Sequence, residues 1–257
     1  MRANVMIDKL RRDEPVFGPM IMDLSGPGLP QIVANAGADF IVYDMEAGCL
    51  DMATIKTQLA LVRGTGLAPI VNTAWHDYAM LARPLDSGAM GLMVPVVQTP
   101  DEAREIVRIS RYTPRGGRGV AFGIAHDDYS MAPIAERMRL ADARTIIMPK
   151  IETALGVENI EAIMAVDGID AAYVGHMDLS VSLGIPGDYM HPKFAAAVDR
   201  IIDACRTRGK HVSCMAANPE AARVWIAKGV RIILYGTDVI LLGGALRSGI
   251  EASRGKP

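Results

Sequence analysis

The stretch Gly37-Ala38-Asp39-Phe40-Ile41-Val42-Tyr43-Asp44 places a glycine just before an apolar run of strand length and an acid just after it. A glycine that follows a helix readily adopts the left-handed conformation that ends the helix, so Gly37 predicts a helix-to-strand joint. The uninterrupted apolar run is typical of a parallel strand buried on both faces. The same succession recurs at five other glycines, which are Gly66, Gly88, Gly168, Gly209 and Gly229.

These joints predict a chain of alternating strands and helices. The segments between them have the apolar spacing of amphipathic helices, and the apolar runs at 20–22 and 146–148 bring the expected strands to eight. We therefore predict an α/β protein with a (β/α)8 TIM barrel. A single domain over residues 1–257 is expected, because one such barrel commonly takes about 250 residues. A longer extended segment, residues 110–144, should connect the fourth and fifth strands.

Composition excludes several classes of partner. The chain has 27 basic and 29 acidic side chains, and a formal net charge of -2 gives no electrostatic reason to expect nucleic acid or a membrane surface. No apolar run reaches the roughly 20 residues of a membrane span, and residues 1–14 are too charged for a signal peptide. Cys49, Cys205 and Cys214 contain no CxxC pair and are expected to be small core residues. A cytoplasmic protein is the resulting prediction.

The predicted barrel indicates where chemistry can take place. In such barrels the active site is built from the carboxyl ends of the strands and the loops just after them. The candidate side chains at these positions are Asp23, Asp44, Glu46, Asn72, Trp75, His76, Lys150, Glu152, His176, Asp178, Met215 and Asp238. Glu152 and Asp178 follow adjacent strands and could give a divalent cation two oxygen ligands, with positions left open for substrate. Acids here can also simply cap the next helix, which is the role expected for Asp51, Asp77 and Asp238.

Five motifs occur in an order and spacing that are specific when taken together. They are Phe40-Ile41-Val42-Tyr43-Asp44-Met45-Glu46, Leu85-Asp86-Ser87-Gly88-Ala89-Met90-Gly91 with Val94-Pro95, Pro114-Arg115-Gly116-Gly117-Arg118-Gly119, Ile151-Glu152-Thr153-Ala154-Leu155-Gly156, and Gly175-His176-Met177-Asp178-Leu179-Ser180 followed by Leu183-Gly184. On these motifs the chain resembles the HpcH/HpaI aldolase and citrate lyase family, the metal-dependent aldolases of 2-oxo acids such as 4-hydroxy-2-oxoheptanedioate. The resemblance covers most of the chain.

The resemblance implies a metal site and a substrate class. The family's metal-binding glutamate and aspartate fall on Glu152 and Asp178, which implies Mg²⁺ or Mn²⁺, with Co²⁺ or Zn²⁺ as alternatives. In the family the substrate's 2-oxo and carboxylate oxygens chelate the metal, and backbone N–H groups hold the carboxylate; here these groups would come from Gly175 to Asp178. The implied partners are a 2-oxo acid and an aldehyde, and family members are homo-oligomers, so a hexamer or trimer is expected.

Three departures from the family pattern fall at the expected site. The family's acid/base histidine falls on Ala47, and the arginine that stabilises the enolate oxygen falls on Asn72. Alanine carries no proton, and asparagine can donate a hydrogen bond but no charge. A glutamine common in the family is Lys150 here. We hypothesise that Lys150 replaces the missing positive charge; the alternative is that Lys150 pairs with Glu46 or Glu152 and is structural.

The missing base leaves several candidates. His176 adjoins the metal motif, His126 lies in the long segment 110–144, and Asp44 matches the aspartate that normally partners the missing histidine. His76 ranks below these. Gly175, Met177, Trp75 and His126 are expected to contact substrate. The glycine-rich 115–119 follows no strand, so it is interpreted as a family loop near the active site rather than a phosphate cradle.

Two functional classes follow. The first is a carbon–carbon lyase that works through a pyruvate enolate, in which a 2-oxo acid decarboxylase would best tolerate the missing histidine. The second is a barrel that binds an oxo acid without catalysis, since two usual catalytic side chains are replaced. A third mechanism, with Lys150 as a Schiff-base nucleophile, requires a depressed lysine pKa and ranks below metal catalysis.

Overall fold

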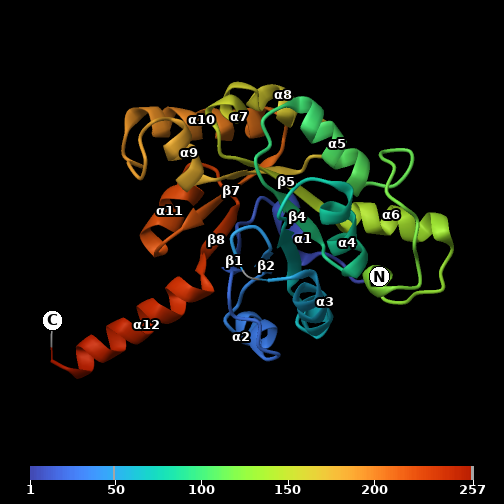
Figure 1. Cartoon of the computed structure of the whole chain (residues 1–257), viewed down its shortest axis with the longest axis horizontal. Coiled ribbons are helices and arrows are strands. Elements are labelled where there is room, and N and C mark those ends of the chain that lie inside the picture. The colour runs from blue at the N-terminus through green and yellow to red at the C-terminus, as the bar shows by residue number, and fades with distance from the viewer. Residues whose placement is uncertain (49, 256–257) are drawn as a thin grey trace.

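The strands of the computed structural model close into a barrel (Figure 1). The structure describes residues 1–48 and 50–255. Within these residues eight strands follow one another around the barrel in chain order, and every neighbouring pair is parallel. They are β1 Val16–Ile21, β2 Phe40–Asp44, β3 Ala68–Asn72, β4 Gly91–Val94, β5 Ile146–Ile151, β6 Ala171–Val174, β7 His211–Ala216 and β8 Ile232–Thr237. The predicted (β/α)8 barrel is confirmed.

Helices lie between the strands and cover the outside of the barrel (Figure 1). Their bounds are α1 Val5–Arg11, α2 Leu29–Asn35, α3 Met52–Leu61, α4 Tyr78–Ser87, α5 Pro100–Ser110, α6 Ile134–Arg144, α7 Ala154–Glu158, α8 Ile160–Met164, α9 His176–Ser182, α10 Pro192–Thr207, α11 Pro219–Ala227 and α12 Asp238–Ser253. Short 3₁₀ turns occupy Val62–Gly64 and Ala125–Asp127. Helix α1 precedes the first strand and packs Met6 and Leu10 into the barrel interior. None of the helices in the described residues is long and apolar enough to span a bilayer.

The strand side chains form two cores. Alternate residues such as Phe40 and Val42 join the cluster inside the barrel, while Ile41 and Tyr43 join the cluster between strands and helices. This alternation follows from the two-residue period of a strand, and burial on both faces explains why the runs are apolar throughout. Cys205 and Cys214 are buried, as predicted. Cys49 lies outside the described residues.

The local signals that mark the joints are confirmed. All six predicted joint glycines have positive φ, between 63° and 113°. Gly88 shows the reason: it ends α4 in the left-handed conformation, with its N–H bonded to the carbonyl of Leu85. Side chains cap α3 and α4 at the expected acids, Asp51 and Asp77. Asp238 behaves differently, because its carboxylate accepts hydrogen bonds from the backbone N–H groups of residues 22–24 in the loop after β1.

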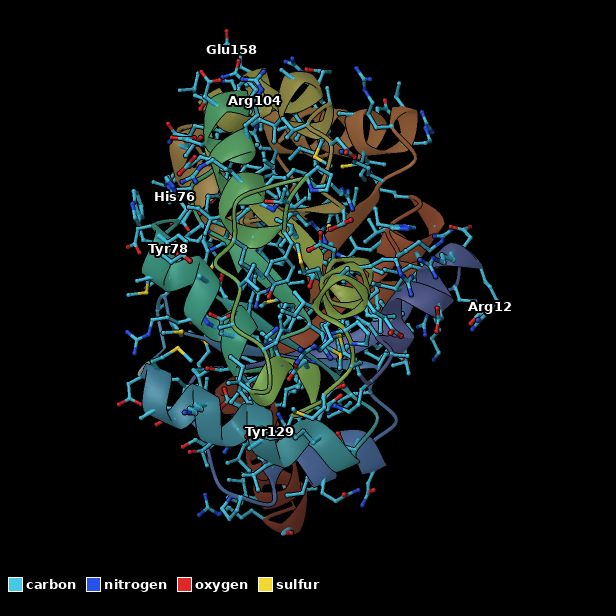
Figure 2. All side chains as sticks on the ribbon, turned by 90° about the vertical axis from the view of Figure 1, so that its right-hand side faces the viewer. Arg12, His76, Tyr78, Arg104, Tyr129 and Glu158 are labelled. Carbon is cyan, nitrogen blue, oxygen red and sulfur yellow. The ribbon has the colours of Figure 1, made fainter. Side chains whose placement is uncertain are left out.

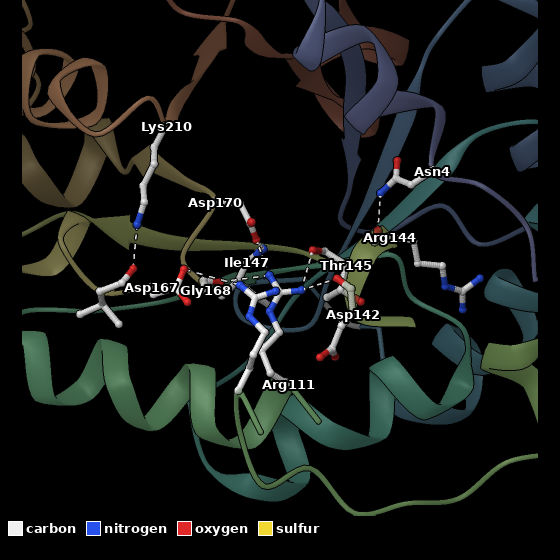
Figure 3. Close-up of polar contacts among 12 residues, drawn as sticks. Asn4, Arg111, Asp142, Arg144, Thr145, Ile147, Asp167, Gly168, Asp170 and Lys210 are labelled. Atoms are coloured by element: carbon white, nitrogen blue, oxygen red, sulfur yellow. Dashed lines mark hydrogen bonds and ion pairs between the residues drawn. The ribbon is translucent and has the colours of Figure 1, made fainter. Parts of the chain in front are cut away.

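A buried arginine ties loops together at the amino end of the barrel (Figure 3). Arg111 follows α5, which runs antiparallel to β4 and therefore ends where the strands begin. Its guanidinium donates to the carbonyls of Asp142, Thr145 and Gly168 at 2.6 to 3.0 Å, and to Asp170 Oδ2 at 2.6 Å. Arg111 is 1% exposed, so this bridge fixes the turns that precede β5 and β6.

The last helix does not join the outer ring. Helix α12 extends away from the barrel (Figure 1). Its exposed apolar side chains are Val239, Ile240, Leu241, Leu242, Leu246 and Ile250, which are 38% to 63% exposed. On the outer face of β8 and β1, Tyr235 and Phe17 stay partly exposed. The chain by itself therefore exposes an apolar helix, α12, and part of the outer face of β8 and β1.

Candidate metal and substrate site

The predicted site residues meet at the carboxyl ends of the strands. Asp44 ends β2 and Asn72 ends β3. Lys150 lies in β5, and Glu152 is the first residue after that strand. All four are at least 93% buried. Lys150 and Glu152 are two residues apart and share a face, as expected from the strand period.

A chain of polar contacts crosses the barrel mouth from β2 to β5. Asn72 Nδ2 donates to Asp44 Oδ1 at 2.5 Å and to Glu46 Oε2 at 3.0 Å. Lys150 Nζ lies 2.5 Å from the same Glu46 oxygen and 3.2 Å from Glu152 Oε2. Only the contact with Glu46 has hydrogen-bond geometry, so Glu152 Oε2 is buried without a hydrogen-bond partner among the described residues.

Two backbone features position the Glu152 side chain: the Val96 N–H and the close approach of Gly175. Its Oε1 accepts a hydrogen bond from the Val96 N–H at 2.7 Å. Val96 has a φ of 53°, a costly conformation for a β-branched residue, which turns its N–H toward Glu152. Gly175 packs so closely that a Cβ there would lie 2.5 Å from Glu152 Oε2. The backbones after β4 and β6 thus restrict where this carboxylate can lie.

Burial and charge act in opposite directions on Lys150 and Glu152. Burial lowers the pKa of Lys150, but the carboxylates of Glu152 and Glu46 raise it by more, so the net pKa is above the usual lysine value. Lys150 is therefore an ammonium at neutral pH, and the depressed pKa that a Schiff-base nucleophile requires is not found. Burial raises the pKa of Glu152 despite the opposing effects of Lys150 and the Val96 N–H. A further cation beside Glu152 would favour its charged form.

The donor set fits a hard divalent cation. Glu152 offers an oxygen that lacks a hydrogen-bond partner, and Asp178 stands exposed in the first turn of α9, three residues beyond Gly175. Among the described residues no three or more His, Cys, Asp or Glu side chains are grouped to hold a metal. Two carboxylates with open positions suit a cation whose remaining ligands are water and substrate oxygens.

The Asp44 carboxylate and the Asn72 amide hydrogens are occupied by hydrogen bonds. Asp44 accepts from Asn72 and from the backbone N–H groups of Glu46, Ala47 and Gly48 at 2.7 to 3.2 Å. Both amide hydrogens of Asn72 are used on Asp44 and Glu46, and its buried Oδ1 has no partner in the described part of the chain. These contacts organise the loop after β2 and orient Glu46, while catalytic roles for Asp44 and Asn72 stay predictions.

The other predicted residues on this end lie at the rim. His176 is partly buried and packs edge-on against Tyr189, with ring centroids 5.3 Å apart, and burial lowers its pKa. Trp75 is 49% exposed and stacked on His76, and Met177 is 64% exposed. The Gly175 N–H donates to the Ile151 carbonyl, so it is not available for a substrate carboxylate.

His126 does not join this site. Two residues labelled in Figure 2 mark the two ends of the barrel. His76 follows the carboxyl end of β3, and Arg12 precedes the amino end of β1. His126 is 1% exposed, and its carbonyl accepts a hydrogen bond from Arg144, the residue that ends α6 just before β5 begins. It therefore lies near the amino end, within a cluster that includes Tyr112 and Phe122. The structure separates it from Glu152, against the expectation that it contacts substrate.

The glycine-rich stretch 115–119 packs against α4 and α5. The Gly117 N–H donates to the Arg108 carbonyl in the last turn of α5. Arg118 pairs with Asp86 near the end of α4 at 2.5 Å, and the Arg118 side chain is 2% exposed. The Gly119 N–H donates to the hydroxyl of Tyr78, the first residue of α4, at 3.2 Å. The interpretation as a loop near the active site stays a prediction.

A family model for HpcH/HpaI aldolase/citrate lyase matches residues 20–244. The chain belongs to the HpcH/HpaI aldolase/citrate lyase family. It is 32% identical over 253 residues to a 4-hydroxy-2-oxo-heptane-1,7-dioate aldolase from Salmonella typhimurium, covering 96% of this chain and 95% of that protein. Two solved family structures are similar throughout. One from Burkholderia cenocepacia has a TM-score of 0.91 and 32% identity, covering 98% of this chain and 100% of that one. One from Desulfitobacterium hafniense has a TM-score of 0.92 and 31% identity, with 98% and 97% covered.

In this HpcH/HpaI chain Asn72 bonds to two acids, Asp44 and Glu46. The ammonium nearest to it comes from β5, where Lys150 reaches Glu46 across the mouth. Glu46 and Glu152, the two predicted partners of Lys150, are both in contact with it. The Val96 N–H and the steric restriction at Gly175 were not foreseen. A positive φ at valine has no sequence signal, whereas the glycine was visible as part of the Gly175–Asp178 motif.

Proposed function

We propose that this chain is a metal-dependent carbon–carbon lyase that cleaves or forms 2-oxo acids, of the 4-hydroxy-2-oxo acid type, through a pyruvate enolate. Family membership supports the lyase class. The observation that carries the proposal is the buried Glu152 Oε2, which has no hydrogen-bond partner among the described residues. Glu152 and Asp178 are the proposed ligands of Mg²⁺ or Mn²⁺. When bound, the cation would polarise the 2-oxo group and stabilise the enolate charge.

The chain's own residues would position the substrate around these ligands. The helix α9 N–H groups of His176 to Asp178 are free of intrahelical partners by geometry and could hold the oxo acid's carboxylate. The Lys150 ammonium, 3.2 Å from Glu152, would add positive charge on the enolate side. Trp75 and Met177 at the rim would contact the aldehyde portion. Which aldehyde is used follows from the loops and stays open to assay.

A decarboxylase is the second candidate, and one observation favours it. Asp44 is fully hydrogen bonded, His176 packs on Tyr189, and His126 lies near the other end of the barrel. Neither Asp44 nor His126 is therefore available as a base at the mouth, and His176 lies at its rim. Loss of CO₂ from a 2-oxo acid with a second carboxylate needs an electron sink but no proton abstraction from carbon, so it tolerates this arrangement.

Exchange of the methyl protons of pyruvate in D₂O tests the lyase proposal. We expect exchange, followed by proton NMR, that depends on added Mn²⁺ or Mg²⁺ and falls at least tenfold in Lys150→Gln at saturating metal. Exchange at the wild-type rate in Lys150→Gln would rule out the proposed role of Lys150 in stabilising the enolate. No exchange with any metal, together with oxaloacetate decarboxylation, would favour the second candidate. Absence of both activities would leave an oxo acid-binding barrel.

We further propose that the chain assembles as a homo-oligomer, a trimer or hexamer, through α12. The support is the helix itself, with its exposed apolar side chains, and the partly exposed outer face of β8 and β1. A second copy could cover both surfaces, by a twofold contact between the same elements in a hexamer or by a head-to-tail contact in a trimer.

A further inference from the structure

Lys150 lies between two carboxylates, and its shorter contact is the one with Glu46. Its Nζ is 2.5 Å from Glu46 Oε2 with hydrogen-bond geometry. The 3.2 Å approach to Glu152 Oε2 lacks that geometry, which leaves the Glu152 oxygen without a hydrogen-bond partner in the described part of the chain. The ammonium is thus directed to the acid that is not a proposed metal ligand.

An ammonium and a divalent cation compete for the same carboxylate oxygen. Lys150 carries its charge on a flexible four-carbon stem, and rotation of that stem could bring Nζ from Glu46 to Glu152. Full pairing with Glu152 would occupy the oxygen and place a positive charge where the cation must bind. Whatever restrains Lys150 at Glu46 therefore influences how tightly the site holds a metal.

The restraint on Lys150 is built from neighbouring strand ends. Glu46 receives an Asn72 N–H on the same Oε2 that contacts Lys150. Asn72 is oriented in turn by Asp44, which three backbone N–H groups hold in place. Asp44, Asn72 and Lys150 are each at least 93% buried, whereas the Glu46 side chain is 27% exposed, so water reaches this chain of contacts at Glu46.

We propose that Glu46, oriented by Asn72, is a positioning residue that restrains the Lys150 ammonium and keeps Glu152 open for the divalent cation. This inference rests on the proposed function, because it takes Glu152 as a metal ligand. Removing Glu46 weakens metal binding by releasing Lys150 toward Glu152. The loss of one negative charge near the cation is a separate effect and has to be measured apart from it.

Titration of Mn²⁺ into each purified variant, with free Mn²⁺ followed by electron paramagnetic resonance, measures this without any activity assay. We expect the Mn²⁺ Kd to rise at least tenfold in Glu46→Gln, and also in Glu46→Asp, which keeps the charge but shortens the side chain. In a Lys150→Met background the further change Glu46→Gln should alter Kd by less than twofold. Glu161→Gln, which removes one charge from the exposed pair with Arg200, is the matched control and should bind Mn²⁺ like the wild type.

The outcomes separate the two proposals. If the wild type binds no Mn²⁺, the metal-dependent function fails first. If the wild type binds Mn²⁺ and Glu46→Gln binds it equally well, the positioning role fails while the function stands. An equal loss of affinity with and without Lys150 would show that Glu46 acts by its charge alone and would also overturn the inference. Thermal unfolding of each variant confirms that the barrel is intact.

Discussion

Glu152 is controlled by the backbone on both sides. On one side Val96 donates its N–H from a conformation that costs about 1–3 kcal/mol for a non-glycine residue. On the other side Gly175 leaves no room for a side chain. Strain of this kind persists where the surrounding structure imposes it, and here it orients one carboxylate. Gly175 is therefore needed because a Cβ at this position would displace the Glu152 side chain.

Gly175→Ala tests this consequence. The added Cβ would lie 2.5 Å from Glu152 Cβ and Oε2, so the carboxylate has to move. We expect the Mn²⁺ Kd to rise tenfold or more, about 1.4 kcal/mol, by isothermal titration calorimetry. Gly64→Ala is the matched control, because nothing lies within 4 Å of its Cβ position. Equal affinity in both variants would show that metal binding does not depend on the position of Glu152.

At the scale of elements, the segment between α5 and α6 packs around buried side chains near the amino end of the barrel. Arg118 pairs with Asp86 on α4 and lies over the Tyr112 ring at 4.8 Å. Tyr112 Oη contacts His126 Nε2 at 3.2 Å, and Arg144 bonds to the His126 carbonyl. Burial, followed by the nearby Arg118, lowers the pKa of His126 to about 4, and Asp127 offsets this only in part. A buried neutral imidazole is therefore part of how this segment packs.

His126 should make stability fall as the medium becomes acidic. Its pKa is about 4 in the folded chain and 6.5 when exposed, so between these values the unfolded chain binds more protons. Stability is then lost as pH falls from 6.5 to 4, by up to about 3 kcal/mol, with little further loss below. Urea unfolding of the wild type and His126→Gln at pH 7 and pH 4.5 measures the difference. Parallel losses in both proteins would rule out His126 as the cause.

At the scale of the whole molecule, the barrel is closed but the outer layer is not. Eleven helices precede α12 in the described residues, and only α12 extends away from the barrel (Figure 1). We propose that residues 1–257 form one domain and that its last helix, α12, packs against another copy of the chain. Val239, Leu242, Leu246 and Ile250 share one face of α12, and Ile240 and Leu241 extend the apolar surface in its first turn. An exposed apolar face of this kind is typical of a helix that packs against a partner.

Leu242→Lys together with Leu246→Lys tests the assembly. Both side chains are about half exposed in the chain alone, at 49% and 55%, so charge there should disrupt a contact between copies while leaving the barrel folded. We expect light scattering after size exclusion to give a trimer or hexamer mass for the wild type and a smaller mass for the variant. Glu251→Lys on the same helix is the control for added positive charge. A wild-type monomer, or a variant with unchanged mass, would contradict the assembly.

The sequence by itself determined the barrel, its strands and the acids at its mouth. These features depend on short-range physics: a glycine accepts positive φ, an apolar run is buried as a strand, and strand ends share one side of the barrel. The proposed ligands Glu152 and Asp178 follow from the same logic together with the family motifs. Only the tertiary structure decided what Lys150 and Asn72 touch, that Asp44 is fully bonded, and that His126 lies near the far end. Those outcomes depend on residues distant in the chain, such as Lys150 and Glu46, which are separated by 104 positions. No local pattern encodes which of two acids an ammonium will reach.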